Sequence, residues 1–269
     1  MSNIATVNTL ISAINHDRFA QIEACHAPGA VFASFRGPTL HDAVAITDWH
    51  RQFQRDYADC AYSELEMIEQ DGVVAARATI EAKGYDWRPF NQRVLEVFEF
   101  GASGEVAARR LYGTLRDIEF DKPAATALAD ARAFKGGNAS ATGTAVAQFL
   151  AAVAASDREG MGALVHEKFA LIDGVYGVAH GLEAALALSG ARPKPAFGTL
   201  RPTRVIAGEH DAVVEWAIDP ARPRLAEWWR LVDGKVRVVE VYWMLREIGV
   251  NPFENLAHDR HSRSPIIPG

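Results

Sequence analysis

One predicted helix places a titratable side chain on an otherwise apolar face. In the segment TLHDAVAITDWHRQFQRDY, the residues Ile46, Trp49, His50, Phe53 and Tyr57 fall at spacings of three and four, so they share one face of a helix. Histidine titrates near neutral pH and can give or take a proton without a cofactor. His50 is therefore a candidate acid or base. The structural alternative is a core histidine that is bonded to a backbone carbonyl.

A strand-like segment, VAARRLYGTLRD, carries a second pair of polar groups. Strand alternation places Arg110 and Tyr112 on the same face. A phenol can donate to a developing oxyanion, and a guanidinium can hold one. We therefore expect these two groups to stabilise negative charge while His50 moves protons. The alternative is a cross-strand ion pair between Arg110 and Glu96 beside a structural tyrosine.

Aromatic and basic side chains gather in the predicted hairpin EAKGYDWRPFNQRVLE. Aromatic rings at the mouth of a pocket suit flat substrates, because they stack and carry polar tips. On the strand before this hairpin, Ala76, Ala78 and Ala82 share one face, where they either leave volume for a ligand or pack closely against helices. The predicted substrate-binding residues are Arg36, Trp49, Phe53, Tyr57, Tyr85, Trp87, Arg93 and Glu96.

The sequence contains no recognisable metal or cofactor motif. His258 and His261 lie three residues apart, but in a polar tail without supporting carboxylates. No glycine-rich dinucleotide or phosphate motif and no CxxC pair is present. Cys25 and Cys60 lie in apolar or helical contexts, which is typical of buried free cysteines. We expect neither a metal nor a cofactor.

Composition narrows the class of protein. The 269 residues are 49% hydrophobic and 23% charged, which is an ordinary globular balance. The net charge of −6 argues against binding to nucleic acid or to an anionic membrane. The start of the chain lacks the features of a signal peptide, and no apolar run reaches the roughly 18 residues of a membrane span. We expect a soluble cytoplasmic protein whose partner is a hydrophobic aromatic small molecule.

The chain repeats itself. The segment EVFEFGASGEVAARRLYGTLRDI aligns with EWWRLVDGKVRVVEVYWMLREI once one residue is dropped in the turn, so that Gly104 matches Gly234 and Tyr112 matches Tyr242. Both segments have the pattern of strand, glycine turn and strand. The starts of the copies, TVNTLISAINHDRF and TAVAQFLAAVAASDRE, both have helical spacing. Each copy is predicted to run helix, helix, strand, helix and four strands, which is an α+β layer fold.

The copies are predicted to occupy residues 1–120 and 144–250. The segment between them, residues 121–143, is rich in small and polar residues and is interpreted as a partly helical linker. Residues 251–269 are predicted to be an irregular tail, either solvated or folded over a pocket.

The first copy is the predicted active-site domain. The last strand of the second copy is apolar on both faces, which indicates that both faces are covered. We therefore expect a structural role for the second copy, packed against the first copy or another subunit. The alternative is a second pocket marked by Tyr176 and His180.

Three segments, FRGPTLHDAVAITDWHRQF, VFEFGASGEVAARRLY and WWRLVDGKVRVVEVYW, resemble SnoaL-like domains. These belong to the nuclear transport factor 2-like superfamily, which includes polyketide cyclases and ketosteroid isomerases. The resemblance covers nearly all of residues 4–120 and also residues 142–250. It implies two tandem cone-shaped α+β barrels, each a curved antiparallel sheet wrapped around about three helices and a deep apolar pocket. Such domains often dimerise through their sheets, so the resemblance also implies a homo-oligomer.

The resemblance leaves the reaction open, because this scaffold hosts enzymes, binding proteins and dimerisation modules. SnoaL-like cyclases often carry a catalytic aspartate where this chain has Thr114 and Met244, which disfavours aspartate-driven cyclisation. Tandem members of the superfamily that act on lignin-derived aromatics are similar in length and layout. These diarylpropane lyases release water and formaldehyde and form a stilbene without a cofactor. The implied function is a cofactor-independent lyase or dehydratase for an aromatic compound.

Two alternatives remain. The first is a polyketide cyclase or ketosteroid isomerase-like enzyme, in which Glu96 or Asp86 would replace the missing carboxylate. The second is a non-catalytic module for small-molecule binding or dimerisation.

Overall fold

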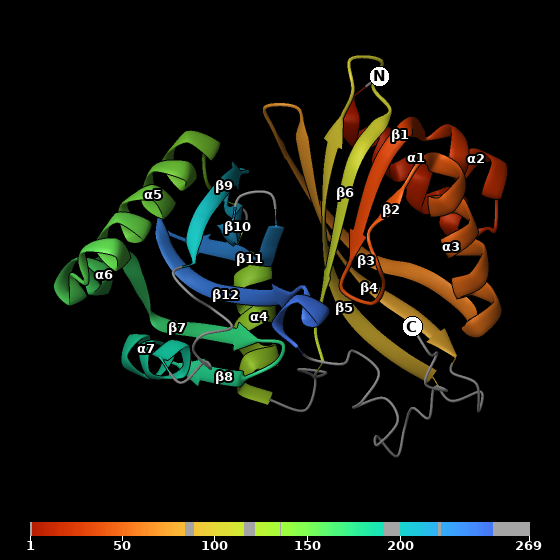
Figure 1. Ribbon diagram of the computed structural model, residues 1–269. Coiled ribbons are helices and arrows are strands. Elements are labelled where there is room, and N and C mark those ends of the chain that lie inside the picture. Colours follow the sequence, from red (N-terminus) through yellow and green to blue (C-terminus); the bar gives the residue numbers. More distant parts are fainter. Residues whose placement is uncertain are drawn as a thin grey trace. The chain divides into compact units, whose positions relative to one another are not determined.

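The computed structural model describes residues 2–83, 89–115, 122–134, 136–190, 200–219 and 222–249. The chain divides into two compact units, which are Met1–Leu115 with Met244–Gly269 (unit 1) and Arg116–Trp243 (unit 2). Each unit combines helices with a mainly antiparallel sheet (Figure 1). The predicted α+β fold class and its tandem organisation are therefore confirmed.

Unit 1 forms its sheet from the second half of its sequence and closes it with its first strand. Strands β3, β4, β5 and β6 are successive antiparallel neighbours, while β1 runs parallel to β6 and antiparallel to β2. Figure 1 shows the three helices on one side of this sheet. The elements are α1 (Asn3–Asn15), α2 (Phe19–Ala24), β1 (His26–Ser34), β2 (Leu40–His41), α3 (Ala43–Asp56), β3 (Ala58–Gln70), β4 (Val73–Lys83), β5 (Pro89–Phe100), β6 (Val106–Gly113) and the 3₁₀ turn η2 (Leu245–Ile248).

Local sequence signals explain where the helices of unit 1 begin. The hydroxyl of Ser2 accepts a hydrogen bond from the backbone of Ala5, which caps α1. The carboxylate of Asp42 accepts from the Ala45 amide at 2.7 Å and caps α3. Because α3 begins there, its buried face carries Ile46 and His50, as the spacing predicts.

Unit 2 repeats this plan. Strands β9, β10, β11 and β12 are antiparallel neighbours, and β7 runs parallel to β12 and antiparallel to β8. Its elements are α4 (Lys122–Ala133), α5 (Ala139–Ala155), α6 (Arg158–Leu164), β7 (Val165–Asp173), β8 (Gly177–His180), α7 (Leu182–Gly190), β9 (Arg201–Ala207), β10 (Asp211–Asp219), β11 (Arg222–Val232) and β12 (Lys235–Trp243).

The two units agree even in strand register. In unit 1 the parallel pair of β1 and β6 matches His26 with Val106. In unit 2 the pair of β7 and β12 matches Val165 with Val236. Both pairs then shift register at a bulge before they continue. Positions of the two units can therefore be compared residue by residue.

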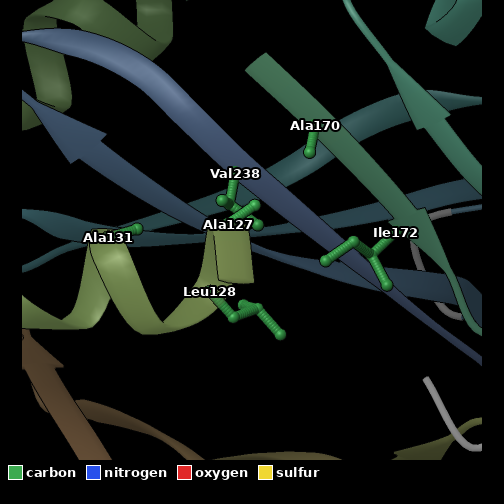
Figure 2. Close-up of a cluster of buried hydrophobic side chains, with 6 residues drawn as sticks. All are labelled: Ala127, Leu128, Ala131, Ala170, Ile172 and Val238. Carbon is green, nitrogen blue, oxygen red and sulfur yellow. The ribbon is translucent and has the colours of Figure 1, made fainter. Parts of the chain in front are cut away.

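Helix α4 lies within the segment that the sequence analysis interpreted as a linker. It covers one face of the sheet of unit 2, as Figure 2 shows. The buried cluster consists of Ala127, Leu128 and Ala131 of α4 with Ala170, Ile172 and Val238 of the sheet. Alanine is the best helix former and allows a helix to approach a sheet closely. An alanine-rich composition is thus typical of a packed helix as well as of a linker, and α5 already begins at Ala139.

The other face of this sheet packs against α5. The ring of Phe149 on α5 lies 5.2 Å from the ring of Trp229, measured between centroids, in an edge-to-face arrangement. Neighbouring residues of a strand point to opposite faces, so Val238 faces α4 while Val239 faces the interior. Helices of unit 2 itself therefore cover both faces, and this explains the two apolar faces of β12.

Candidate functional site

His50 lies in the interior of unit 1 and is held by an arginine. Its side chain is only 2% exposed, and its Nε2 lies 2.8 Å from Nη1 of Arg109. Arginine can only donate, so Nε2 accepts and the proton of the neutral ring sits on Nδ1. Among the described residues, Nδ1 has no hydrogen-bond partner. Arg109 therefore fixes Nε2 of the ring, while the N–H group at Nδ1 remains available as a donor.

Arg109 belongs to a buried ion pair. Its Nε and Nη2 bond to the two carboxylate oxygens of Glu96 at 2.5 and 3.1 Å, and the hydroxyl of Tyr62 donates to Glu96 at 2.7 Å. The guanidinium carbon also lies 4.6 Å from the ring centroid of Phe32 and 5.6 Å from that of Phe98. Burial of two charges costs free energy, which a two-pronged geometry and an aromatic surrounding offset.

The electrostatics of this cluster keep His50 neutral. Burial is the main cause that holds the pKa of His50 well below its usual range, and the charge of Arg109 lowers it further. Burial opposes the charge of Arg109, but the charges of and hydrogen bonds to Glu96 and Tyr62 together outweigh burial and raise the pKa of Arg109. At neutral pH the interior therefore contains a charged Arg109–Glu96 pair next to an uncharged imidazole.

A second buried histidine, which the sequence analysis missed, lies nearby. His26 begins β1 and is 4% exposed. Its Nδ1 lies 2.8 Å from the carbonyl oxygen of Ile22, so Nδ1 carries the proton and Nε2 has a free lone pair. Nε2 is buried without a partner in the part of the chain that the structure describes. Burial, together with the charge of Arg109, lowers the pKa of His26 to about 4.

The observed alternation of β6 corrects the predicted catalytic constellation. Arg109 points toward His50. Because successive side chains of a strand alternate, Arg110 and Tyr112 point to the opposite face of the sheet. Arg110 pairs there with Glu99 at 2.7 Å. The interior partner of His50 is therefore Arg109, one residue before the predicted Arg110.

The ion pair with Glu96, considered above as a structural alternative, is also formed by the preceding arginine. In that alternative Arg110 pairs with Glu96, whereas in the structure Arg109 pairs with Glu96. The two arginines are adjacent, and a displacement by one residue exchanges the faces of a strand. Tyr112 is fully buried, but on the face that does not contain His50.

Four of the predicted substrate-binding residues form one cluster, which consists of a buried cation and three aromatic rings. The guanidinium carbon of Arg36 lies 5.2 Å from the ring centroid of Phe53 and 5.3 Å from that of Tyr57. Trp49 stacks on Phe53 with a centroid distance of 5.2 Å and meets the ring of His50 edge-on at 4.9 Å. These side chains therefore form a continuous aromatic layer from Arg36 to His50.

The remaining predicted residues divide into three cases. Glu96 lies in the interior, as described above. Arg93 lies on β5, three residues before Glu96, and alternation therefore turns it to the opposite face. Tyr85 and Trp87, like Asp86, lie outside the described residues.

Unit 2 contains a partly open cavity of about 240 Å³. Aliphatic and aromatic side chains of α5, α7 and the sheet line most of it, and Glu227 provides a carboxylate that is 7% exposed. The indole nitrogens of Trp216 and Trp229 donate to the same oxygen of Glu227, at 2.8 and 2.9 Å. This cavity does not coincide with the alternative pocket proposed from Tyr176 and His180, neither of which lines it.

Other kinds of site receive no support within the described ranges. No group of three or more histidine, cysteine or carboxylate side chains among these residues is arranged to hold a metal ion. Cys25 and Cys60 are both buried free thiols, and burial raises the pKa of each. None of the helices described has both the length and the apolar character needed to cross a membrane.

Comparison with known proteins gives the family. Residues 7–109 and 146–239 each match the SnoaL-like domain. Among solved structures, an NTF2-like protein of unknown function from Burkholderia pseudomallei is 18% identical, with a TM-score of 0.39 over 42% of this chain and 92% of that protein. A putative polyketide cyclase from Streptomyces antibioticus is 16% identical, with a TM-score of 0.38 over 42% and 92%.

A third solved structure is that of a hypothetical protein with a ketosteroid isomerase-like fold from Catenulispora acidiphila, in complex with trimethylamine. It is 12% identical, with a TM-score of 0.38 over 40% of this chain and 83% of that protein. No curated protein matches the chain.

Proposed function

Because the chain belongs to the SnoaL-like domain family, whose scaffold serves several kinds of function, we propose that unit 1 is a cofactor-independent lyase or dehydratase. Its substrate is a hydrophobic, aromatic small molecule such as a diarylpropane diol. The observation that carries this proposal is the contact of Arg109 with Nε2 of His50 in a buried interior. Strongly shifted pKa values next to a buried ion pair are typical of functional sites.

The two histidines offer complementary groups to a substrate. His50 presents an N–H donor at Nδ1, and His26 presents a lone pair at Nε2. Their charges interact, because a proton on His26 lowers the pKa of His50. One imidazole can accept a proton from a hydroxyl group while the other donates to a departing oxygen. Arg109 acts as a positioning residue that holds His50 in the donor tautomer.

The proposed reaction balances without an added reactant. His26 accepts the proton of a primary hydroxyl, which allows the adjacent carbon–carbon bond to break and release formaldehyde. The electron pair of that bond forms a carbon–carbon double bond and expels the benzylic hydroxide, to which His50 donates a hydrogen bond. The proton from the primary hydroxyl converts this hydroxide to water. One diol gives one stilbene, one formaldehyde and one water.

The aromatic layer supports the choice of substrate. Trp49 and Phe53 are half-buried, so their rings extend from the interior toward the surface. Stacking on such rings favours flat substrates. Arg36 lies against the same layer, and a guanidinium is suited to the phenolic or methoxy oxygens of lignin-derived rings.

A polyketide cyclase-like reaction is a weaker candidate. It needs an inward carboxylate that can accept a proton, and Glu96 is the described candidate. Both oxygens of Glu96 already accept from Arg109, and Tyr62 donates to it as well. Donors of the protein itself therefore already occupy most of its lone pairs, which leaves little acceptor capacity for a substrate.

Two conservative variants of His50 test the proposal. His50→Gln keeps an acceptor for Arg109 but removes the donor at the Nδ1 position, whereas His50→Asn keeps a donor there and loses the contact with Arg109. With a 1,2-diarylpropane-1,3-diol as substrate, we expect His50→Gln to lower kcat by about 100-fold or more with the fold retained. The readouts are stilbene absorbance and formaldehyde release.

The same experiment separates an enzyme from a binding module. If His50 only stabilises the interior, His50→Gln keeps its activity or the wild type has none, while His50→Asn is the less stable variant. If the wild-type protein binds the diol without releasing formaldehyde, the lyase assignment fails and the binding module is favoured.

A further inference from the structure

Thr47 carries a buried hydroxyl group on helix α3 of unit 1. It lies three residues before His50, and its side chain is 2% exposed. Within the described ranges, Oγ1 of Thr47 has no hydrogen-bond partner. A buried hydroxyl group without a partner costs free energy, because folding has removed it from water. The reaction proposed for unit 1 gives this group no role so far.

Other threonines of the chain show that a helix can satisfy such a hydroxyl group by itself. Thr9 of α1 donates to the carbonyl oxygen of Ala5, four residues earlier, at 2.9 Å. Thr144 of α5 donates in the same way to Ser140, also at 2.9 Å. A threonine within a helix can generally form this bond. Thr47 does not form it, so its hydroxyl group is available to a partner outside the helix.

The repeat of the fold relates Thr47 to a residue of unit 2. The register of the first and last strands places Ala30 of β1 and Phe169 of β7 at equivalent positions. The residue directly before α3 donates its amide to the carbonyl oxygen of Ala30, and the residue directly before α7 donates to that of Phe169. The two helices therefore start in the same register, and Thr47 corresponds to Leu186.

The equivalent residues of unit 2 show that Thr47 faces the interior. The buried positions of α3 and the cavity-lining positions of α7 are the same four, namely Ala43, Ile46, Thr47 and His50 in α3 and Leu182, Ala185, Leu186 and Ser189 in α7. Unit 2 has Val165 and Val239 at the positions of His26 and Arg109. The hydroxyl group of Thr47 thus occurs in the unit that also has the polar groups proposed for catalysis.

We propose that Thr47 is a second donor to the oxygen that departs in the reaction of unit 1, an inference that rests on the proposed function. Residues three apart on a helix are neighbours, with Cβ atoms roughly 5–6 Å apart, so Thr47 and His50 can contact the same small group. His50 donates to the benzylic oxygen from Nδ1. The hydrogen of the Thr47 hydroxyl can rotate and is donated to the same oxygen.

Two donors stabilise this oxygen better than one. Negative charge develops on it as the carbon–oxygen bond breaks, and donors that are already in place stabilise such a charge without reorganisation. Both donated hydrogens stay on the protein, so the balance of the reaction is unchanged. The same pair makes the site selective, because a benzylic alcohol satisfies both donors and a deoxy analogue satisfies neither.

Turnover of variants gives the first test. Thr47→Val removes the hydroxyl group and retains the shape of the side chain, whereas Thr47→Ser retains the hydroxyl group. With a 1,2-diarylpropane-1,3-diol as substrate, we expect Thr47→Val to lower kcat about tenfold or more and Thr47→Ser to restore most of this loss. The Tm of Thr47→Val should not fall, because no internal hydrogen bond is lost. The matched control Thr9→Val removes a hydroxyl group that is bonded within α1 and should leave kcat unchanged.

Two unreactive ligands test the contact without turnover. 3-Methoxy-1,2-diphenylpropan-1-ol carries the benzylic hydroxyl group but has no primary hydroxyl proton to lose, and 1-methoxy-2,3-diphenylpropane lacks the benzylic hydroxyl group as well. Isothermal titration calorimetry gives the ratio of their Kd values. We expect the wild type to bind the alcohol about tenfold more tightly. This ratio should fall by about threefold or more in Thr47→Val and stay the same in Thr9→Val.

The two assays separate this inference from the proposed function. If the wild type converts the diol and Thr47→Val does so equally well, the lyase assignment stands and Thr47 is not a donor to the departing oxygen. If the wild type has no turnover, the proposed function fails, and the ratio of Kd values still decides whether Thr47 contacts a ligand hydroxyl. The same ratio in wild type and Thr47→Val, or binding of neither ligand, would overturn the role of Thr47.

Discussion

Glu96 pairs with Leu111 and Glu227 pairs with Val241, which are equivalent positions of the last strand in the two units, but the two glutamates have different neighbours. In unit 1, Arg109 forms an ion pair with Glu96 and also contacts Nε2 of His50. In unit 2, Val239 stands at the position of the arginine and lines a cavity, and two indoles hold the glutamate. Unit 1 has a buried cation and a charged network at this place. Unit 2 has an aliphatic side chain and an apolar cavity instead.

A second pair of positions exchanges large and small residues. In unit 1 the amide of Phe35 bonds to Leu111, and its ring lies over Gly113. In unit 2 the equivalent amide is that of Gly174, and the residue that corresponds to Gly113 is Trp243. The aromatic ring therefore comes from the residue after the first strand in unit 1 and from the last strand in unit 2. Each unit thus has one aromatic residue and one glycine at this pair of positions, but the two residue types are exchanged.

The largest effect is expected from the removal of the buried cation. Arg109→Leu leaves Glu96 buried without its counter-charge, and we expect a loss of about 3–5 kcal/mol in the free energy of unfolding. Urea denaturation measures it. The double variant Arg109→Leu with Glu96→Gln should recover much of this loss, because no charge is then stranded. A loss under about 1 kcal/mol for the single variant would show that the network of unit 1 is not essential for its stability.

Acid should weaken unit 1 through His26. The pKa of His26 falls from its ordinary value of 6.5 to about 4 on folding, so the unfolded chain binds a proton in this interval that the folded chain does not. The free energy of unfolding therefore falls as pH drops from 6.5 to 4, and the stability contribution is complete above 6.5. This difference in pKa between the unfolded and the folded chain corresponds to about 3 kcal/mol in the free energy of unfolding. His50, whose pKa is also lowered, acts in the same direction.

The variant His26→Asn checks this assignment, because an asparagine amide can still donate to the carbonyl of Ile22. Urea denaturation at several pH values should show a shallower pH dependence for the variant than for the wild type. Identical slopes would mean that other groups cause the loss of stability in acid.

A smaller loss of stability is expected from a change in the contact between Phe35 and Gly113. A Cβ atom on Gly113 would lie 2.5 Å from the ring of Phe35, so Gly113→Ala forces the ring to move and should cost about 1–3 kcal/mol. Thermal unfolding of the variant measures the loss. Phe35→Leu in the same chain should restore part of it. If Gly113→Ala alone is neutral, the contact between ring and glycine is looser than the distance implies.

The smallest effect is a gain in stability. Ala185 is buried and lines the cavity of unit 2, so Ala185→Leu adds apolar contacts where space exists and should stabilise the protein by about 0.5–1 kcal/mol. Differential scanning calorimetry can resolve such a shift. A destabilised variant would indicate that the cavity closes in solution.

Patterns that are local in the sequence predicted the fold. The glycine turns, the apolar spacing on helices and the repeat of the last hairpin depend on neighbouring residues, and the spacing of Ile46 and His50 placed the histidine correctly on α3. The alanine-rich segment was predicted to be a partly helical linker, and α4 lies within it; its composition alone does not reveal that the helix packs on a sheet.

The site could be predicted only in part. Arg109 and Arg110 are adjacent, and much of β6 is buried, so the sequence offered no contrast between a polar and an apolar face to choose the inward arginine. His26 stands at a strand end without a periodic pattern, and its role depends on contacts with distant elements. The cavity of unit 2 depends on how side-chain volumes from α5, α7 and the sheet add up, which no single segment reveals.

The pairing of the first strand of each unit with its last strand has a consequence for biosynthesis. β1 reaches its long neighbour β6 only when Val106–Gly113 has been translated, and β7 waits in the same way for Lys235–Trp243. Until then, a nascent chain exposes an unpaired strand edge, which is prone to aggregation. A pause in translation once residue 113 has left the exit tunnel would give the first half time to complete its sheet before the second half emerges.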